Sequence, residues 1–178
     1  MVALVVASFA LVASGCGGDD GSASGSPVDE WATGFCTAVT GWTGELQQIE
    51  NDFTTDPGSF ADADALKDAV ESVSSATDDF VADVRALGTP DTESGEEVRS
   101  SLDDLAETLE TEKADIEQAA EDVSGLTDLP AAITSIGTSL SAMGAAFQTA
   151  LEALESADVK GELEDALESS DACAELTS

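Results

Sequence analysis

Residues 98–123, VRSSLDDLAETLETEKADIEQAAEDV, decide the fold class of this chain. Apolar side chains recur there at alternating steps of four and three residues, a spacing that places them on one face of an α-helix. Only Glu112 interrupts the series, and we expect its carboxylate to extend to water. Ser94 and Glu97 predict a capping box before this helix, and Gly125 predicts its end. The apolar positions are Val98, Leu102, Leu105, Leu109, Ile116, Ala119 and Val123.

Three further stretches share this helical spacing. No segment shows the two-residue period of a strand between hairpin turns, so no sheet is expected. The apolar positions of the first stretch are Phe35, Val39, Trp42, Leu46, Ile49 and Phe53. Those of the second are Leu66, Val70, Val73, Thr77, Phe80, Val84 and Leu87. The last stretch follows residues 98–123 in the chain, and its apolar positions are Ile133, Ile136, Leu140, Met143, Phe147, Ala150 and Leu154.

Residues that favour helix ends separate these stretches. The starts are predicted at Ser26-Pro27 with Asp29 and Glu30, at Ser59 with Asp62, and at Pro130. The stops are predicted at Asp56-Pro57-Gly58 and at Gly88 with Pro90.

Amphipathic helices of this length with short connections predict an all-α fold, an antiparallel four-helix bundle spanning residues 27–178. A shorter fifth segment, Val159 to Leu176, carries apolar residues on one face. It either continues the fourth helix after a bend near Lys160-Gly161 or folds back onto the bundle. Its apolar positions are Leu163, Ala166, Leu167 and Cys173.

The charge balance of the chain is extreme. Its 178 residues include 38 acidic and 5 basic ones, a formal net charge of −33. Such a polyanion repels nucleic acid and anionic lipid headgroups, so neither is expected as a direct partner. Apolar residues make up 42% of the chain, too many for a disordered acidic protein. We expect the acidic pairs Asp78-Asp79 and Asp103-Asp104 to lie beside the core and face water.

The N-terminus has the features of an export signal. An apolar run from Val2 to Val12 is followed by Ala13-Ser14-Gly15-Cys16. This string resembles the bacterial lipobox, with Ala13 in place of the usual Leu. The resemblance implies a signal peptide at residues 1–15, which is removed, and acylation of Cys16, with palmitate as the expected fatty acid. Residues 16–26 then form a flexible tether that holds the domain on the extracytoplasmic face of the cell membrane.

Export into an oxidising compartment leaves Cys36 and Cys173 as a candidate pair, since Cys16 is assigned to the lipid. A disulfide between them would tie the first helix to the last segment. The alternative is two free thiols with a redox role. We favour the disulfide because the sequence contains no Cys-x-x-Cys motif and no neighbouring base.

The overall pattern resembles small helical lipoproteins of actinobacteria, the high-GC Gram-positive bacteria. The shared features are the lipobox, a Gly/Ser-rich tether, an opening such as Trp31 to Cys36 that places an aromatic residue before a cysteine, and a late cysteine followed by leucine. This resemblance implies a location and a helical fold more than an activity.

Enzymatic chemistry is not expected. The chain contains no His and no Tyr, which excludes the Ser-His-Asp triad, histidine zinc sites and histidine-containing di-iron bundles. No nucleotide-binding loop is recognisable and no cofactor is expected. Four acidic residues around the first turn could gather calcium, but their spacing does not match an EF-hand, so we expect only weak, diffuse binding and no dedicated metal site. These residues are Asp52, Asp56, Asp62 and Asp64.

Two hypotheses for function follow. The first is a membrane-anchored interaction module that recognises another protein of the cell envelope or a basic ligand. The second is a ligand-binding or sensory bundle with an apolar pocket between helices. Gly137 and Gly144, seven residues apart beside the fourth apolar stripe, bear on this choice. We expect them to mark tight packing against a neighbouring helix, and the alternative is a cleft for an apolar ligand.

Overall fold

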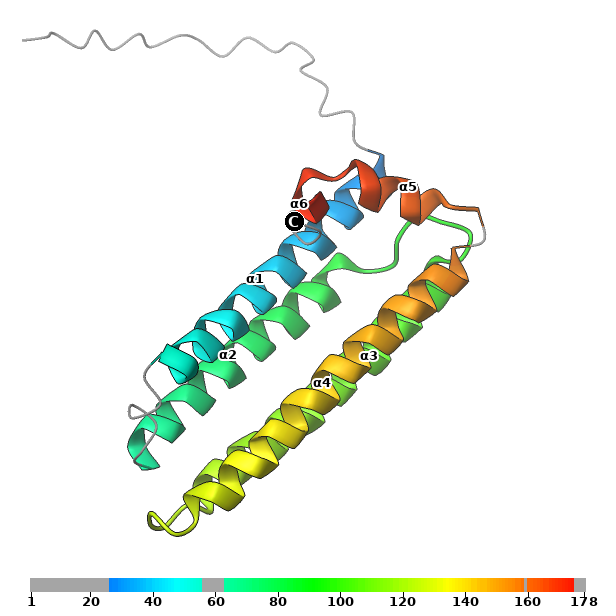
Figure 1. The fold of residues 1–178 in the computed structure, drawn as a ribbon. Coiled ribbons are helices and arrows are strands. Elements are labelled where there is room, and N and C mark those ends of the chain that lie inside the picture. The colour runs from blue at the N-terminus through cyan, green and yellow to red at the C-terminus, as the bar shows by residue number, and fades with distance from the viewer. Residues whose placement is uncertain (1–25, 56–62, 159, 175–178) are drawn as a thin grey trace, which may run out of the picture.

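The computed structural model describes residues 26–55, 63–158 and 160–174, which form helices and no strands. The four long helices run up and down and pack together, so the predicted all-α antiparallel bundle is confirmed (Figure 1). They are α1 (Pro27–Thr55), α2 (Ala63–Leu87), α3 (Gly95–Glu121) and α4 (Leu129–Ala157). Two short helices follow, α5 (Glu162–Ser169) and α6 (Asp171–Ala174).

Local sequence signals explain two of the helix ends. At the start of α1 the backbone N–H of Ser26 donates to Asp29 Oδ2 at 2.6 Å, and the N–H of Asp29 donates to Ser26 Oγ at 3.2 Å. This reciprocal capping satisfies two backbone donors that the first helical turn leaves unpaired. At the end of α2, Gly88 has a φ of +69°, the left-handed conformation that glycine adopts without steric cost.

The two ends of α3 differ from the prediction, which was a capping box of Ser94 and Glu97 at the start and an end at Gly125. Ser94 is the N-cap residue, but its side chain makes no capping bond, and its carbonyl instead accepts from the N–H groups of Glu97 and Val98. The helix ends at Glu121, before Gly125. The turn that follows is held by the carboxylate of Asp128, which accepts from both the N–H and the hydroxyl of Ser124.

Several predictions fall on residues outside those that the structure describes. They concern the signal peptide at residues 1–15, Cys16 and its tether, the stop at residues 56–58, the capping pair Ser59 and Asp62, and three side chains of the acidic cluster, those of Asp52, Asp56 and Asp62. The fourth acidic residue, Asp64, lies in the first turn of α2.

Three of the four neighbouring helix interfaces are closed. α2 packs along both α1 and α3, and α3 packs along α4. Leu102, Leu109 and Ile116 of α3 are almost wholly buried in the common core. At the end of the stripe, Ala120 rather than Ala119 turns fully inward, while Glu112 stays partly exposed as expected.

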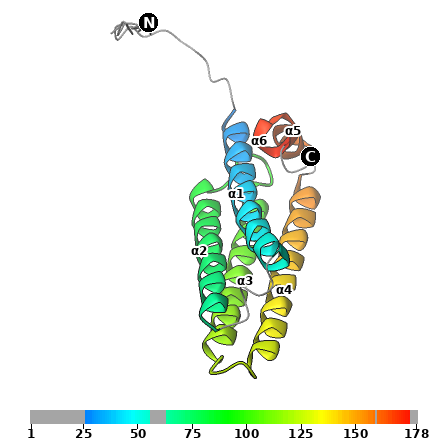
Figure 2. The ribbon, with the colours of Figure 1, turned by 60° about the vertical axis from the view of Figure 1, so that its left-hand side comes forward.

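The fourth interface is different. Over the described residues, α1 and α4 do not lie in close contact along their lengths. Near the start of α1, helices α5 and α6 pack against it instead, on the side toward α4 (Figure 2). The fifth segment therefore folds back, after a turn at Gly161 with a φ of +72°. Among the described residues, the interface between α1 and α4 remains open in the half of the bundle remote from α5 and α6.

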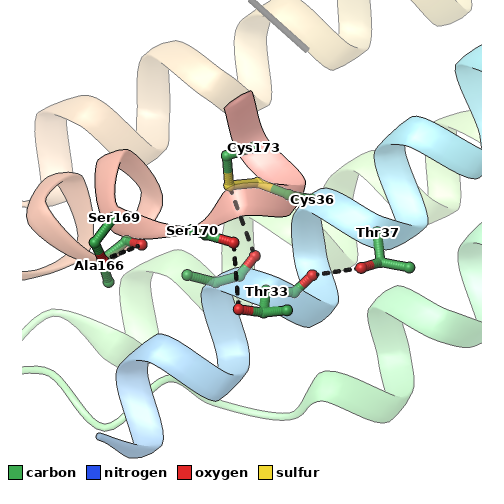
Figure 3. Close-up of a disulfide and its surroundings, with 8 residues drawn as sticks. Thr33, Cys36, Thr37, Ala166, Ser169, Ser170 and Cys173 are labelled. Atoms are coloured by element: carbon green, nitrogen blue, oxygen red, sulfur yellow. Dashed lines mark hydrogen bonds between the residues drawn. A yellow bond between two sulfur atoms is a disulfide. The ribbon is translucent and has the colours of Figure 1, made fainter. Parts of the chain in front are cut away.

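A disulfide fixes the returning segment in place. Cys36 of α1 and Cys173 of α6 are bonded, with their Cα atoms 5.0 Å apart, as predicted (Figure 3). The hydroxyls of Thr33 and Ser170 share a hydrogen bond of 3.2 Å beside it. Leu163 and Ala166, on the apolar face of this segment, are buried in the core.

Ion pairs between α2 and α3 use two of the five basic side chains. Arg85 of α2 binds both carboxylate oxygens of Glu110 on α3, at 2.7 and 3.0 Å, and this bond lowers the pKa of Glu110. Lys113 of α3 binds Asp78 of α2, which raises the pKa of Lys113. Asp78, Asp79, Asp103 and Asp104 all face solvent, as predicted.

Candidate functional site

The open interface contains an apolar groove. It has a volume of about 600 Å³ and lies between α1, α2 and α4 in the half of the bundle remote from α5 and α6. None of the described residues that line it is charged. From α1 and α2 these are Trp42, Thr43, Leu46, Ile49, Leu66, Ala69, Val70 and Val73. From α4 they are Ile133, Ile136, Gly137, Leu140, Met143, Gly144, Phe147 and Gln148.

An aromatic cluster lies at one end of the groove. The ring of Trp42 lies 4.9 Å from Phe80 and 5.8 Å from Phe147, between ring centroids. These contacts join α1, α2 and α4 at mid-height in the bundle. The indole N–H of Trp42 donates to the hydroxyl of Thr77 at 3.4 Å, and that hydroxyl donates in turn to the carbonyl of Val73. The cluster is thus fixed in position, with its polar atoms paired.

Helix α4 supplies half of the lining and has an unusual composition. From Leu129 to Leu151 it contains no Asp, Glu, Lys or Arg, although charged residues make up 24% of the chain. Three apolar side chains on this helix, Ile133, Leu140 and Leu151, are each more than one-third exposed. On a polyanionic protein, α4 therefore presents an uncharged and partly apolar face.

The hydroxyl groups on α4 reinforce this low polarity. Within the uncharged run, four Ser and Thr side chains each donate to the backbone carbonyl four residues earlier, so their donors are satisfied within the helix. Such a face loses less hydration than a charged one when a ligand covers it. These side chains are Thr134, Thr138, Ser141 and Thr149.

The two glycines of α4 correct one prediction. Tight packing against a neighbouring helix was expected at Gly137 and Gly144. A Cβ atom added at either position would meet nothing within 4 Å, and both residues line the groove. The missing side chains widen the groove, so the alternative of an apolar cleft fits these positions. Gly34 of α1 shows the contrast, because a Cβ there would approach Leu87 Cδ2 to 2.5 Å.

The apolar stripe on α4 also needs correction. Ile133 and Leu140 were assigned to the core by their spacing, but they face the open interface. Met143, Ala150 and Leu154 of the same stripe are buried as predicted. The uncharged run from residue 129 to 151 was the signal in the sequence that could have separated this helix from the others.

The remaining predicted site residues lie apart from the groove or outside the described residues. Cys36 and Cys173 form their disulfide where α6 meets α1, while Cys16 is not described. In the described part of the chain, no three Asp, Glu or Cys side chains are grouped closely enough to hold a metal ion. Within the same ranges, no helix has both the length and the hydropathy needed to span a bilayer.

The fold and the groove define an all-α bundle with one open helix interface. The chain matches no known protein family, no curated protein and no solved structure.

Proposed function

We propose that this protein is an exported lipoprotein, anchored to the cell membrane through Cys16, that binds an apolar small molecule in the groove between α1 and α4. The uncharged groove is the observation that carries this proposal. Its volume of about 600 Å³ falls within the range of small-molecule pockets, roughly 300 to 1,000 Å³. Its lining, mostly aliphatic and aromatic with two polar side chains, has the composition of such pockets.

The proposed role is binding without catalysis. Apolar side chains and two neutral polar ones offer no general base, no nucleophile with a neighbouring base and no metal ligand set. The absence of His and Tyr from the whole sequence supports the same interpretation. A carrier, a scavenger or a sensor of an apolar compound fits these residues.

The position of the groove fits a tethered protein. The tether precedes α1, and Trp42 lies fifteen residues after Pro27, about 22 Å along the helix at 1.5 Å per residue. The groove therefore lies in the half of the bundle away from the N-terminal end of α1, which the tether precedes in the sequence. In this arrangement a bound ligand stays accessible to the space outside the membrane.

The second candidate function is an envelope interaction module. The observation that favours it is the exposed, uncharged face of α4, because interface cores are depleted in charged residues. A protein partner would cover Leu140 and Leu151, whereas a small ligand would enter the groove beside Leu140. The concave shape and volume of the groove favour the small ligand.

A neutral fluorescent probe tests the proposal. We expect the full chain carrying Cys16→Ser, which is not acylated and needs no detergent, to bind N-phenyl-1-naphthylamine saturably with one site. Gly144→Leu places a side chain in the groove and should abolish this binding. Gly44→Leu is the matched control, since Gly44 is also helical with open space around it but does not line the groove.

Both leucine variants should be more stable than the parent, by about 0.5 to 1 kcal/mol, because leucine has the higher helix propensity. Loss of probe binding in Gly144→Leu therefore cannot be attributed to unfolding. Equal probe binding in all three proteins would contradict the proposal.

A further inference from the structure

We propose that the ligand is a long-chain amphiphile with an uncharged, hydrogen-bonding headgroup, and that the groove excludes the fatty acid anion. This inference rests on the proposed function and names the ligand class for the same site. The headgroup lies at Thr43 and Gln148, and the alkyl chain extends toward Ile49 and Ile133.

The groove is polar at one end only. Thr43 and Gln148, the two polar side chains of the lining, each follow directly after a residue of the aromatic cluster, Trp42 or Phe147. The ring contact between these aromatics brings α1 and α4 together at this level. The two polar side chains therefore lie at the end of the groove beside the aromatic cluster, one on α1 and one on α4.

These two side chains have hydrogen-bonding capacity to offer. The hydroxyl of Thr43 donates to the carbonyl of Val39 at 2.8 Å, which leaves its oxygen able to accept a further bond. Gln148 is exposed and carries both a donor and an acceptor on its amide. A hydroxyl or amide headgroup can donate to Thr43 and exchange bonds with Gln148.

The other end of the groove suits an alkyl chain. Beyond the polar pair the lining consists of apolar side chains and glycines, ending at Ile49, Leu66 and Ile133. From Gln148 to Ile133 helix α4 advances by about 22 Å at 1.5 Å per residue. An acyl chain in one leaflet spans about 15 Å, half the thickness of a bilayer's hydrocarbon core. The groove is thus long enough to bury a whole chain.

The charges of the protein disfavour an anionic headgroup. No basic side chain is among the described residues that line the groove, and four of the five basic residues bind carboxylates elsewhere in the bundle. The fifth, Lys67, follows Leu66 at the end of the groove remote from Thr43 and Gln148. A carboxylate in the groove would lose hydration without gaining a cationic partner, in the field of a chain with a net charge of −33. An uncharged headgroup avoids this cost and can still use both polar side chains.

Competition among amphiphiles with the same alkyl chain tests the inference. The full chain with Cys16→Ser, loaded with N-phenyl-1-naphthylamine, is titrated at pH 8 with 1-monolauroylglycerol, laurate or dodecyltrimethylammonium below their micelle concentrations. We expect the monoacylglycerol to displace the probe at the lowest concentration. Laurate should need at least about tenfold more, because its carboxylate finds no cationic partner beside Thr43 and Gln148 and is repelled by a chain with a net charge of −33. Comparable or tighter binding of laurate or of the cation would overturn the inference.

Variants of the polar end complete the test. Thr43→Val with Gln148→Leu should weaken the affinity for the monoacylglycerol by about fivefold or more relative to the affinity for the probe, which makes no hydrogen bond that these changes would remove. The matched control, Thr108→Val with Gln118→Leu, makes the same changes on α3 outside the groove and should alter neither affinity. An unchanged monoacylglycerol affinity in the groove variant would refute the headgroup position. If the parent chain did not bind the probe at all, the proposed function itself would fail.

Discussion

Removal of the disulfide between Cys36 and Cys173 should destabilise the bundle strongly. The bond joins residues 137 positions apart, almost the whole folded domain. For a loop of this length, chain-entropy reasoning gives a stabilisation of about 5 kcal/mol. The reasoning assumes an expanded unfolded chain, and mutual repulsion within a chain of net charge −33 favours that state. For a domain of this size, each kcal/mol lowers the melting temperature by about 2 to 4 °C, so we expect a fall of about 10 to 20 °C.

Calorimetry of the parent and of Cys36→Ala with Cys173→Ala, each with and without a reducing agent, measures this effect. Alanine is chosen because Cys36 is buried and serine would place a hydroxyl in the core. The reducing agent should lower the melting temperature of the parent and leave the double variant unchanged. A fall of less than about 3 °C in both comparisons would refute the chain-entropy reasoning and with it the structural role of the bond.

Four further outcomes are expected. Leu109→Ala should lower the free energy of unfolding by about 2 to 5 kcal/mol in urea denaturation, because this side chain is fully buried. Glu110→Gln should destabilise the protein at neutral pH. Since the pKa of Glu110 is held below its usual 4.5 by Arg85, the difference from the parent should disappear as the pH falls through that lowered pKa. Moderate salt should raise the melting temperature by screening repulsion among the carboxylates, and a fall would contradict this. Cys16→Ser should abolish labelling by radioactive palmitate and release the protein from membranes, whereas persistent labelling would refute the proposed anchor.

Much of the fold could be predicted because local patterns and global packing agree. The stripes on α2 and α3 face the core as their spacing requires, and the Ser26 and Asp29 cap begins α1 where the sequence placed it. Cys36 and Cys173 meet because an even number of helices returns the chain to the end where it started, and α6 then folds back across it.

The groove could not be predicted because periodicity shows which side of a helix is apolar but not what covers it. Ile133 and Leu140 have the spacing of core residues, yet the neighbouring helix does not close over them. The glycines beside them allow either close approach or open space, and only the position of α1 decides between the two. The uncharged run on α4 does distinguish this helix, since a surface helix of this chain otherwise carries many carboxylates.

The fluorescence of Trp42 tests the central claim most directly. The chain contains two tryptophans, and Trp31→Phe leaves Trp42, which lines the groove, as the single reporter. A monoacylglycerol with a brominated alkyl chain quenches tryptophan on contact. We predict saturable quenching with one ligand per protein, which is lost when Gly137→Leu and Gly144→Leu fill the groove. Quenching that rises linearly without saturation, or that is equal in the filled variant, would contradict the assignment of the groove as the binding site.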